Sequence, residues 1–294
     1  MIELLRTENI SFRYDVKLQA LKNVSVTFHK GELVAVLGCN GAGKSTFFLC
    51  CNGVLKPESG EIYNKSMKMT GSKKDIIALR QAVGLVFQDP DSQIIAGTVE
   101  SEVSFGPMNL RLPRDEVENR VDDALSQMNL SNYKNYAPQY LSGGEKKRVS
   151  IADILAMRSE IILLDEPTAS LDPLNTDALE SIILELNQKG ITVVISTHDV
   201  DFAYRFAQRA IVFANGEVVA DGNIEDVFKS EEILTRAGLR KPMLLSAAQS
   251  LEKQFAVSHK GIKPRDISEF EQYINELINK EQHDEIIKAV GVEA

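Results

Sequence analysis

The chain has 294 residues, of which 44% are hydrophobic and 26% are charged, and its formal net charge is −9. This length suits one large domain or two smaller ones, and the acidic balance argues against a nucleic-acid-binding protein, which normally presents a basic face. The three cysteines, Cys39, Cys50 and Cys51, fit neither a disulfide framework nor the spacing of a zinc site, which favours a reducing cytoplasm.

Hydrophobic runs are short throughout the chain. None approaches the roughly 20 apolar residues that a membrane-spanning helix needs. The first residues, MIELLRTENISF, also lack the basic region followed by an apolar block that marks a signal peptide. We therefore expect a protein that is made and kept in the cytosol, where it could dock on a membrane protein.

Three segments alternate apolar and polar side chains, as half-buried strands do. They are residues 4–14, 21–31 and 210–222, and the last contains an Asn215–Gly216 turn that is typical of a hairpin. These segments predict an antiparallel β layer beside the core of the fold.

Three other runs are almost wholly apolar and rich in β-branched residues. They are Glu32–Leu37, Ile161–Asp165 and Ile191–Ser196, and helical patterns lie between them, such as the one that ends at Gly190. Strands that are buried on both faces and separated by helices predict a parallel sheet in an α/β fold.

The octapeptide GCNGAGKS, Gly38–Ser45, directly follows the first of these buried strands and opens a predicted helix. It fits the phosphate-loop pattern, in which glycines let N–H groups surround a phosphate, a lysine reaches the β- and γ-phosphates and a hydroxyl binds Mg²⁺. The other interpretation, a glycine-rich turn with a solvated lysine, is disfavoured by the flanking strand and helix. The candidate nucleotide-binding residues are Gly38, Cys39, Asn40, Gly41, Ala42, Gly43, Lys44, Ser45 and Thr46, with Ser45 also as a Mg²⁺ ligand.

The chain becomes helical and more polar between about residues 91 and 148. Val117, Val121 and Leu125 recur at four-residue steps, which predicts an amphipathic helix. We interpret this region as a helical subdomain inserted into a first domain of residues 1–240.

A C-terminal extension, residues 241–294, carries a separate helical stripe. Its apolar members are Phe270, Tyr273, Ile274, Leu277 and Ile278. An amphipathic helix must bury this face, so the stripe either packs on the first domain or serves dimerisation or regulation.

Polar residues follow the ends of several predicted strands, where α/β sheets gather their sites. Asp165 could bind Mg²⁺ through water, and Glu166 could polarise the attacking water as a general base. His198 could hydrogen-bond a γ-phosphate, and Gln88 could contact Mg²⁺ or the attacking water. Taken alone, the two acids could cap a helix, His198 could be structural and Gln88 could be a turn residue. Together they predict catalytic roles for Glu166, His198 and Gln88, and metal-binding roles for Asp165, Gln88 and Ser45.

The segment LSGGE, residues 141–145, runs directly into a charged helix. Two glycines at a helix start let the backbone approach an anion, which the free N–H groups and the helix dipole attract. A turn between two packed elements explains the same residues equally well, so this segment by itself leaves both interpretations open.

Six segments resemble the ATP-binding cassette family in order and spacing: the phosphate loop, Gln88, LSGGE, ILLDEP, SLD at 170–172 and THD at 197–199. The resemblance covers roughly residues 3–240. It implies a phosphate-loop NTPase fold, with a RecA-like parallel core, an antiparallel β subdomain, a helical signature subdomain and a C-terminal helical extension. In that family, LSGGE completes the ATP site of a second chain. The resemblance therefore implies that Ser142, Gly143, Gly144 and Glu145 meet a partner's nucleotide at a helix starting near Glu145, and that Tyr14 stacks on adenine.

The stretch from Val83 to Leu110 is similar, more narrowly, to the ATP-binding subunits of energy-coupling-factor importers, including cobalt and nickel systems. This resemblance implies an ATPase that uses ATP and Mg²⁺ and lies peripherally on the cytoplasmic face of the cell membrane. Its implied partners are membrane-spanning transport subunits, reached through residues 89–105, and a second ATPase chain, identical or paralogous; no nucleic acid is expected. The cargo would be cobalt, nickel or a vitamin.

Two other functions are weighed against transport. A soluble ATPase of the same family could act in DNA repair or translation, but such proteins usually carry long coiled coils or two cassettes. A regulatory module could bind nucleotide without turnover, but Glu166 and His198 argue for hydrolysis.

Overall fold

A six-stranded sheet forms the centre of the fold. The computed structural model describes residues 1–16, 18–254 and 263–290, with side chains described to residue 278. The strand order is β10-β9-β3-β8-β7-β6, and all strands from β9 to β6 run parallel. The strands are β3 Leu33–Leu37, β6 Val83–Val86, β7 Ile161–Asp165, β8 Thr192–Thr197, β9 Arg209–Ala214 and β10 Glu217–Asn223. This arrangement confirms the predicted parallel α/β core.

A second sheet is antiparallel, in the order β2-β1-β4-β5. Its strands are β1 Glu3–Arg13, β2 Gln19–His29, β4 Ser59–Asn64 and β5 Met67–Lys68. The sheet confirms the antiparallel layer predicted from residues 4–14 and 21–31. The hairpin predicted at Asn215–Gly216 is also confirmed, because β9 and β10 pair antiparallel. Its placement in the antiparallel layer is wrong, since β9 pairs in parallel with β3 and both strands belong to the central sheet. Residues 210–214 are all buried, as in a core strand.

Strand β3 shows how both faces of the central sheet are filled. Leu33, Ala35 and Leu37 belong to one hydrophobic cluster, and the two valines between them belong to the other. Successive side chains of a strand point to opposite faces, so a run without polar residues needs cover on both sides. Helix α1, Lys44–Cys51, supplies cover on the second face. The loop between β3 and α1 is thereby held by two buried elements.

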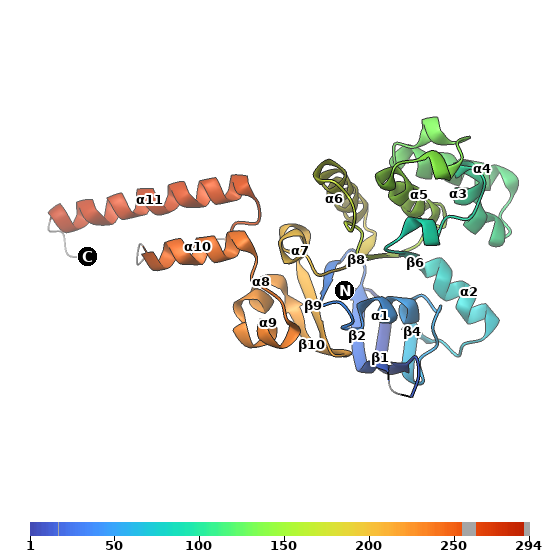
Figure 1. Ribbon diagram of the computed structural model, residues 1–294, viewed down its shortest axis with the longest axis horizontal. Helices are drawn as coiled ribbons and strands as arrows, with labels where there is room; N and C mark the ends of the chain where they lie inside the picture. The colour runs from blue at the N-terminus through green and yellow to red at the C-terminus, as the bar shows by residue number, and fades with distance from the viewer. Residues whose placement is uncertain (17, 255–262, 291–294) are drawn as a thin grey trace.

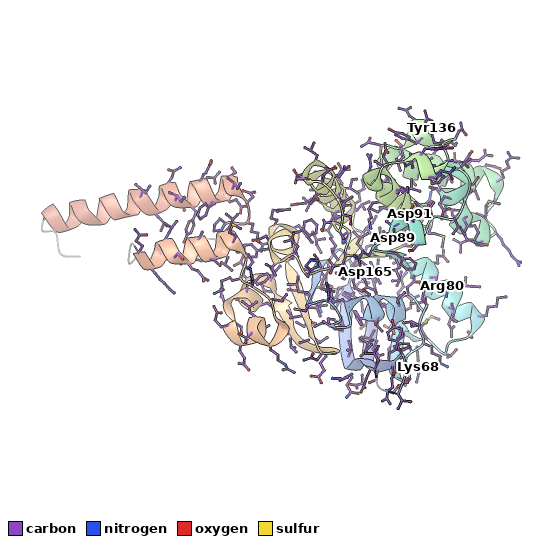
Figure 2. The ribbon with its side chains drawn as sticks, viewed as in Figure 1. Lys68, Arg80, Asp89, Asp91, Tyr136 and Asp165 are labelled. Atoms are coloured by element: carbon purple, nitrogen blue, oxygen red, sulfur yellow. The ribbon has the colours of Figure 1, made fainter. Side chains whose placement is uncertain are left out.

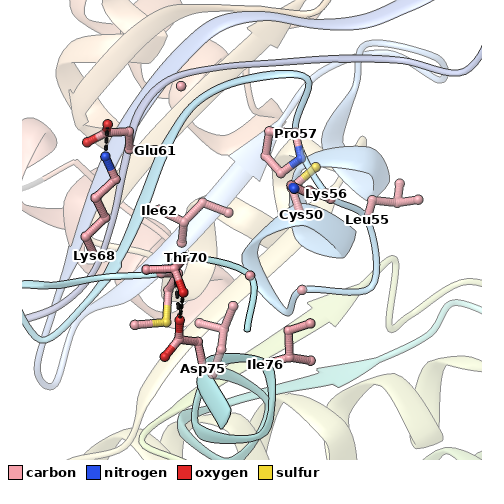
Figure 3. A pocket seen from close by; sticks show the side chains of 15 residues that line it. Cys50, Leu55, Lys56, Pro57, Glu61, Ile62, Lys68, Thr70, Asp75 and Ile76 are labelled. Atoms are coloured by element: carbon pink, nitrogen blue, oxygen red, sulfur yellow. Dashed lines mark hydrogen bonds and ion pairs between the residues drawn. The ribbon is translucent and has the colours of Figure 1, made fainter. Parts of the chain in front are cut away.

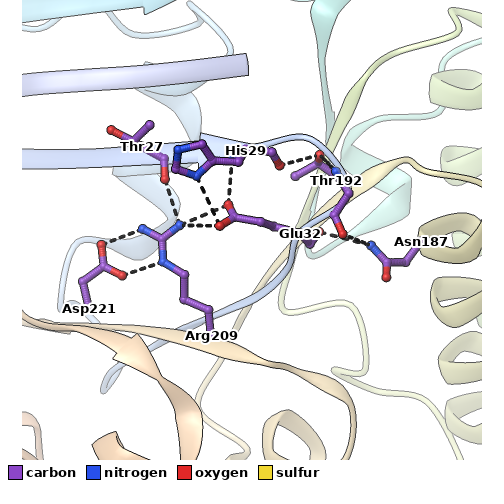
Figure 4. A network of polar contacts seen from close by, with 8 residues as sticks. Thr27, His29, Glu32, Asn187, Thr192, Arg209 and Asp221 are labelled. Carbon is purple, nitrogen blue, oxygen red and sulfur yellow. Dashed lines mark hydrogen bonds and ion pairs between the residues drawn. The ribbon is translucent and has the colours of Figure 1, made fainter. Parts of the chain in front are cut away.

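A polar network joins the two sheets (Figure 4). Arg209 pairs with Asp221 at 2.6 Å and with Glu32 at 3.1 Å, and it donates to the carbonyl oxygen of Thr27 at 2.9 Å. Glu32 also accepts a hydrogen bond from the backbone N–H of His29 at 2.7 Å. These contacts fix the end of β2 to the start of β3, on the strand that leads into the phosphate loop.

Helices inserted between β6 and β7 form a unit at one end of the molecule (Figure 1). They are α3 Val99–Asn109, α4 Arg114–Gln127 and α5 Gly143–Ala156, with short 3₁₀ turns at Pro90–Ser92, Ser131–Tyr133 and Pro138–Tyr140. Val117, Val121 and Leu125 are buried on α4, which confirms the predicted amphipathic helix. Helix α5 continues past residue 148, and its last turns join the hydrophobic cluster of the central sheet.

The C-terminal helices extend away from the two sheets in Figure 1. The helices not yet named are α2 Lys73–Ala82, α6 Pro173–Gln188, α7 Val200–Phe206, α8 Ile224–Lys229, α9 Glu231–Ala237, α10 Met243–Gln254 and α11 Ile267–Val290. In the predicted stripe of α11, Tyr273 and Leu277 are buried, and they pack against Ala248 of α10. The neighbouring helix therefore covers part of the stripe, Ile278 stays 40% exposed, and the boundary at residue 240 stays a prediction.

Within the described residues, no helix has both the length and the apolar character needed to cross a membrane.

Candidate nucleotide-binding site

A pocket of about 360 Å³ lies over the phosphate loop. It collects residues from four separate parts of the chain at the carboxyl ends of the central strands. Those that line it are Tyr14, Leu18, Ala20, every residue from Cys39 to Thr46, Gln88 and Glu166. Ligands of open α/β sheets bind at this edge, so the fold brings most of the predicted site residues to one place.

The loop itself can be built only with glycine at particular positions. Gly38 has φ 152°, and a Cβ atom there would lie 2.5 Å from the carbonyl oxygen of Phe213. Gly43 has φ 108°, and its Cβ would lie 2.7 Å from the carbonyl oxygen of Ala20. Both glycines therefore allow a close backbone approach that a residue with a side chain could not make.

Lys44 is the charge at the centre of the pocket. It is 5% exposed, and its Nζ donates to the carbonyl oxygen of Gly38 at 2.6 Å. The same ammonium lies 3.3 Å from Oε1 of Glu166. The two groups predicted to act on the phosphate and on water are thus already in contact.

Glu166 has the geometry of a reactive carboxylate. It is 7% exposed, and Nδ1 of His198 lies 3.1 Å from its Oε2. Its Oε1 accepts no hydrogen bond from the described residues, although the Lys44 ammonium is near. Its φ of 42° is uncommon for a residue with a side chain, and its N–H donates to the carbonyl oxygen of Ser196 at 3.0 Å. A strained, buried acid with an unsatisfied oxygen fits a role in activating water.

The candidate metal ligands surround the same edge. Asp165 accepts a hydrogen bond from the hydroxyl of Ser196, while Ser45 and Gln88 line the pocket. Hydroxyl, carboxylate and amide oxygens are hard donors that suit Mg²⁺. The described part of the chain contains no group of three or more His, Cys, Asp or Glu side chains able to hold a metal alone. The donor set has a single carboxylate and therefore fits Mg²⁺ held jointly by protein side chains and phosphates, as is usual for that ion.

Tyr14 stands at the mouth of the pocket. Its ring is 53% exposed, packs edge-on against Phe12 with centroids 5.0 Å apart, and its hydroxyl lies 3.2 Å from Oγ1 of Thr46. These two contacts hold the edge and the hydroxyl of the Tyr14 ring, and a ring held in this way can offer one face for stacking. This geometry supports the predicted adenine contact.

The LSGGE segment does not line this pocket. Ser142 is the N-cap of α5, its hydroxyl accepts from the N–H of Glu145 at 3.3 Å, and Oε2 of Glu145 accepts from the N–H of Ser142 at 2.7 Å. The helix thus begins at Gly143, two residues before Glu145 and close to the predicted start, and this reciprocal cap closes its first turn. The hydrogen bond from the Ser142 backbone lowers the pKa of Glu145. The Glu145 carboxylate is therefore engaged in capping, and only the helix start is free for a ligand.

The two glycines of LSGGE differ in their surroundings. A Cβ on Gly143 would meet nothing within 4 Å, whereas one on Gly144 would lie 2.4 Å from Oδ1 of Asn175 at the start of α6. A side chain at position 144 would thus force Asn175 to move, whereas Gly143 faces open space.

Sequence reasoning missed one buried polar residue beside the site. Lys147 is 2% exposed, and its Nζ donates to the carbonyl oxygens of Phe87 at 2.9 Å and Gln88 at 2.6 Å. Burial lowers the pKa of Lys147 to about 8. Its spacing from Gly144 and Ile151 places it on the buried face of α5, and this helical period was the available signal.

Another pocket, of about 220 Å³, lies between α1, α2 and β4 (Figure 3). Leu55, Pro57 and Ile62 contribute apolar surface, and the polar pairs Glu61–Lys68 and Thr70–Asp75 border it. None of the predicted site residues lines this pocket, and its acids are engaged with neighbours.

Comparisons with known proteins agree with this geometry. The family model described as ABC transporter matches residues 21–169, about half of the chain. The energy-coupling factor transporter ATP-binding protein EcfA of Methanothermobacter thermautotrophicus is 50% identical over 242 residues, covering 82% of this chain and 77% of the relative. The EcfA of Methanocaldococcus jannaschii is 44% identical over 251 residues, covering 85% and 90%.

Solved structures give the same result. CbiO1 of Clostridium perfringens, described as part of the ABC transporter complex cbiONQ, has a TM-score of 0.72 at 38% identity and covers 86% of this chain and 100% of its own. A dimeric post-hydrolysis state of the ATP-binding cassette MJ0796, bound to ADP and Pi, has a TM-score of 0.67 at 31% identity and covers 75% and 99%. The chain is thus an ATPase that belongs to the ATP-binding cassette family, as an ATP-binding subunit of the energy-coupling-factor type.

Proposed function

We propose that two such cassettes hydrolyse ATP between them and energise an importer whose membrane-spanning subunits carry cobalt. Nickel and then a vitamin are the next candidates for the cargo, in the order suggested by the resemblance to cobalt and nickel systems. The observation that carries the hydrolytic part is the cluster of Lys44, Glu166 and His198 at the edge of the central sheet. On this proposal the protein lies on the cytoplasmic face of the cell membrane.

The proposed chemistry starts from the contact between Lys44 and Glu166. A triphosphate in the loop offers Lys44 a stronger anion than one carboxylate, so the ammonium turns to the β- and γ-phosphates. Glu166 is then free to accept a proton from the attacking water, and His198 to hydrogen-bond the γ-phosphate. Mg²⁺, when bound, neutralises developing charge on the phosphates, with Ser45, Asp165 and Gln88 as its candidate ligands.

The second half of the site would come from a partner cassette. Residues 142–144 lie outside the pocket of their own chain, and Gly143 faces open space at the N-terminus of a helix of 14 residues. Free N–H groups there suit the γ-phosphate of a nucleotide held by the other chain. A neighbouring structure is described as a dimeric cassette, which supports this arrangement.

A groove of about 460 Å³ offers a docking place for the membrane subunit. Ile95 and Phe105 line it, are 74% and 56% exposed, and belong to the segment predicted to contact that subunit. Glu102 is buried, and Asp153 is half-buried with a buried Oδ1 that has no hydrogen-bond partner among the described residues. Burial first, and the charge of Glu102 second, raise the pKa of Asp153. An apolar helix carrying a cationic or N–H-donating side chain would satisfy both features.

The test is reconstitution. The chain is purified from native membranes, its hydrophobic partners are identified and placed with it in lipid vesicles, and ATP-dependent uptake of Co²⁺ and Ni²⁺ is measured. Uptake that disappears without ATP supports the proposal. Recovery of ribosomes or DNA in place of membrane subunits would favour the soluble alternatives.

A further inference from the structure

One buried cation, Lys147, connects the Gln88 segment of the nucleotide pocket to helix α5, whose start is proposed to face the partner's nucleotide. Lys147 lies on α5, one turn after Gly144, and its ammonium donates to the carbonyl oxygens of Phe87 and Gln88. Strand β6 ends at Val86, so both carbonyls belong to the segment that leaves the central sheet for the helical unit.

The contacts of this lysine are unusual for a buried ammonium, which is generally held by a direct carboxylate partner. Both of its hydrogen bonds go to neutral backbone oxygens, while Asp165 and Asp89 attract it from a greater distance. Figure 2 labels Asp165 at the sheet edge and Asp89 on the segment that follows β6. An apolar side chain of the same length would avoid the cost of burying the charge but would leave both carbonyl oxygens without this donor, so the part that Lys147 plays is to hold this stretch of backbone.

Two other contacts hold the segment after β6 in place. The side chain of Gln93 accepts from the N–H of Phe87 at 3.0 Å, and Lys146 pairs with the exposed Asp91 at 2.7 Å. Lys147 is the buried member of this set and the one that reaches the backbone of Gln88 itself. Its loss would remove the two hydrogen bonds that join the backbone of Phe87 and Gln88 to α5.

We propose that Lys147 is a positioning residue for ATP hydrolysis, which fixes the Gln88 segment to the helix start that this chain presents to its partner. The inference rests on the proposed roles of Gln88 and of residues 142–144. In its own chain, Lys147 holds the Gln88 backbone so that the side chain faces the pocket of Glu166. Toward the partner, it makes the Gln88 segment and the start of α5 move together, so that each site senses the nucleotide of the other.

The experiment compares Lys147→Met with Lys146→Met in the full-length chain. Both changes remove one lysine from α5, but only the first removes the donor to Phe87 and Gln88. Lys147→Met is expected to lower kcat for ATP about tenfold or more while changing KM less than about twofold, because the phosphate loop is untouched. Lys146→Met is expected to keep the wild-type kcat, since it removes a rim ion pair. Lys147→Gln keeps an uncharged N–H donor and is expected to retain more of the rate than Lys147→Met.

Amide hydrogen exchange and binding of a fluorescent ATP analogue complete the test. Exchange at Phe87 should become faster in Lys147→Met, whereas analogue binding by the single chain should match wild type and so report a folded protein. Equal kcat values for the two lysine variants would overturn the proposal, as would a loss confined to KM or unchanged exchange at Phe87. A wild-type chain that does not hydrolyse ATP, or a Gln88→Ala variant with full activity, would instead contradict the proposed function.

Discussion

Replacing Glu166 with glutamine tests the central contact of the site. The substitution keeps the size of the side chain but removes the charge that lies 3.3 Å from Lys44. Two unit charges at that separation attract by about 5 kcal/mol at an effective dielectric constant of 20, and the cost of burying both charges offsets much of this. If about a quarter of this attraction remains as a net free energy, it must be overcome when Lys44 turns from Glu166 to the triphosphate. Removing the charge of Glu166 then strengthens ATP binding by about tenfold.

Hydrolysis should respond in the opposite direction. Glutamine cannot accept the proton of the attacking water, so we expect ATP turnover by Glu166→Gln to fall by roughly a hundredfold or more. Tighter binding with lost turnover should also trap the ATP-bound dimer. Phosphate release measures turnover, titration with a fluorescent ATP analogue measures affinity, and size-exclusion chromatography with light scattering measures the dimer.

The matched control is Glu180→Gln. Glu180 pairs with Arg205 at 2.9 Å and lies outside the nucleotide pocket, so this variant removes a paired carboxylate of the same kind elsewhere. It should hydrolyse and bind ATP like wild type. Near-normal hydrolysis by Glu166→Gln would refute the general-base role, and unchanged ATP affinity would refute the competition between Glu166 and the triphosphate.

Three further predictions follow from the surroundings of the site. Gly143→Asp places a negative charge in open space at the start of α5, where the proposed site would hold the partner's γ-phosphate. Phosphate-release assays should show that hydrolysis is abolished, while the single chain still binds the ATP analogue. Weakened binding by the single chain would contradict action on the partner's nucleotide. The pKa of Asp153 is raised in the folded protein, so ionisation of Asp153 destabilises the fold progressively as the pH rises above the unfolded pKa of about 4. Thermal denaturation should therefore show that Asp153→Asn raises the melting temperature more at pH 8 than at pH 4. An equal change in melting temperature at both pH values would contradict this. Deleting residues 241–294 should preserve ATP-analogue binding but weaken the dimer in light scattering, and an unchanged dimer would assign the extension another role.

The local patterns of the sequence were enough to predict the elements that carry the site. The glycine loop lies between an apolar strand and a helix, Asp165 ends a strand, and Glu166 and His198 directly follow strand ends. These features could be predicted because hydrophobic period and turn chemistry are local properties. Parallel strands place their carboxyl ends at one edge, so the meeting of Lys44, Glu166 and His198 could be expected from the sequence.

Contacts between distant segments were decided only by the tertiary structure. The run at 210–214 joined the parallel core because β3 offered it an open edge, which no local pattern records. Asn175 limits the space at Gly144, and the carbonyl oxygens of Phe87 and Gln88 accept hydrogen bonds from Lys147, although these neighbours are tens of residues away in the chain. The sequence thus determined which chemical groups the protein carries, whereas packing determined which of them are buried, paired or left free to act, since burial and pairing depend on the whole fold.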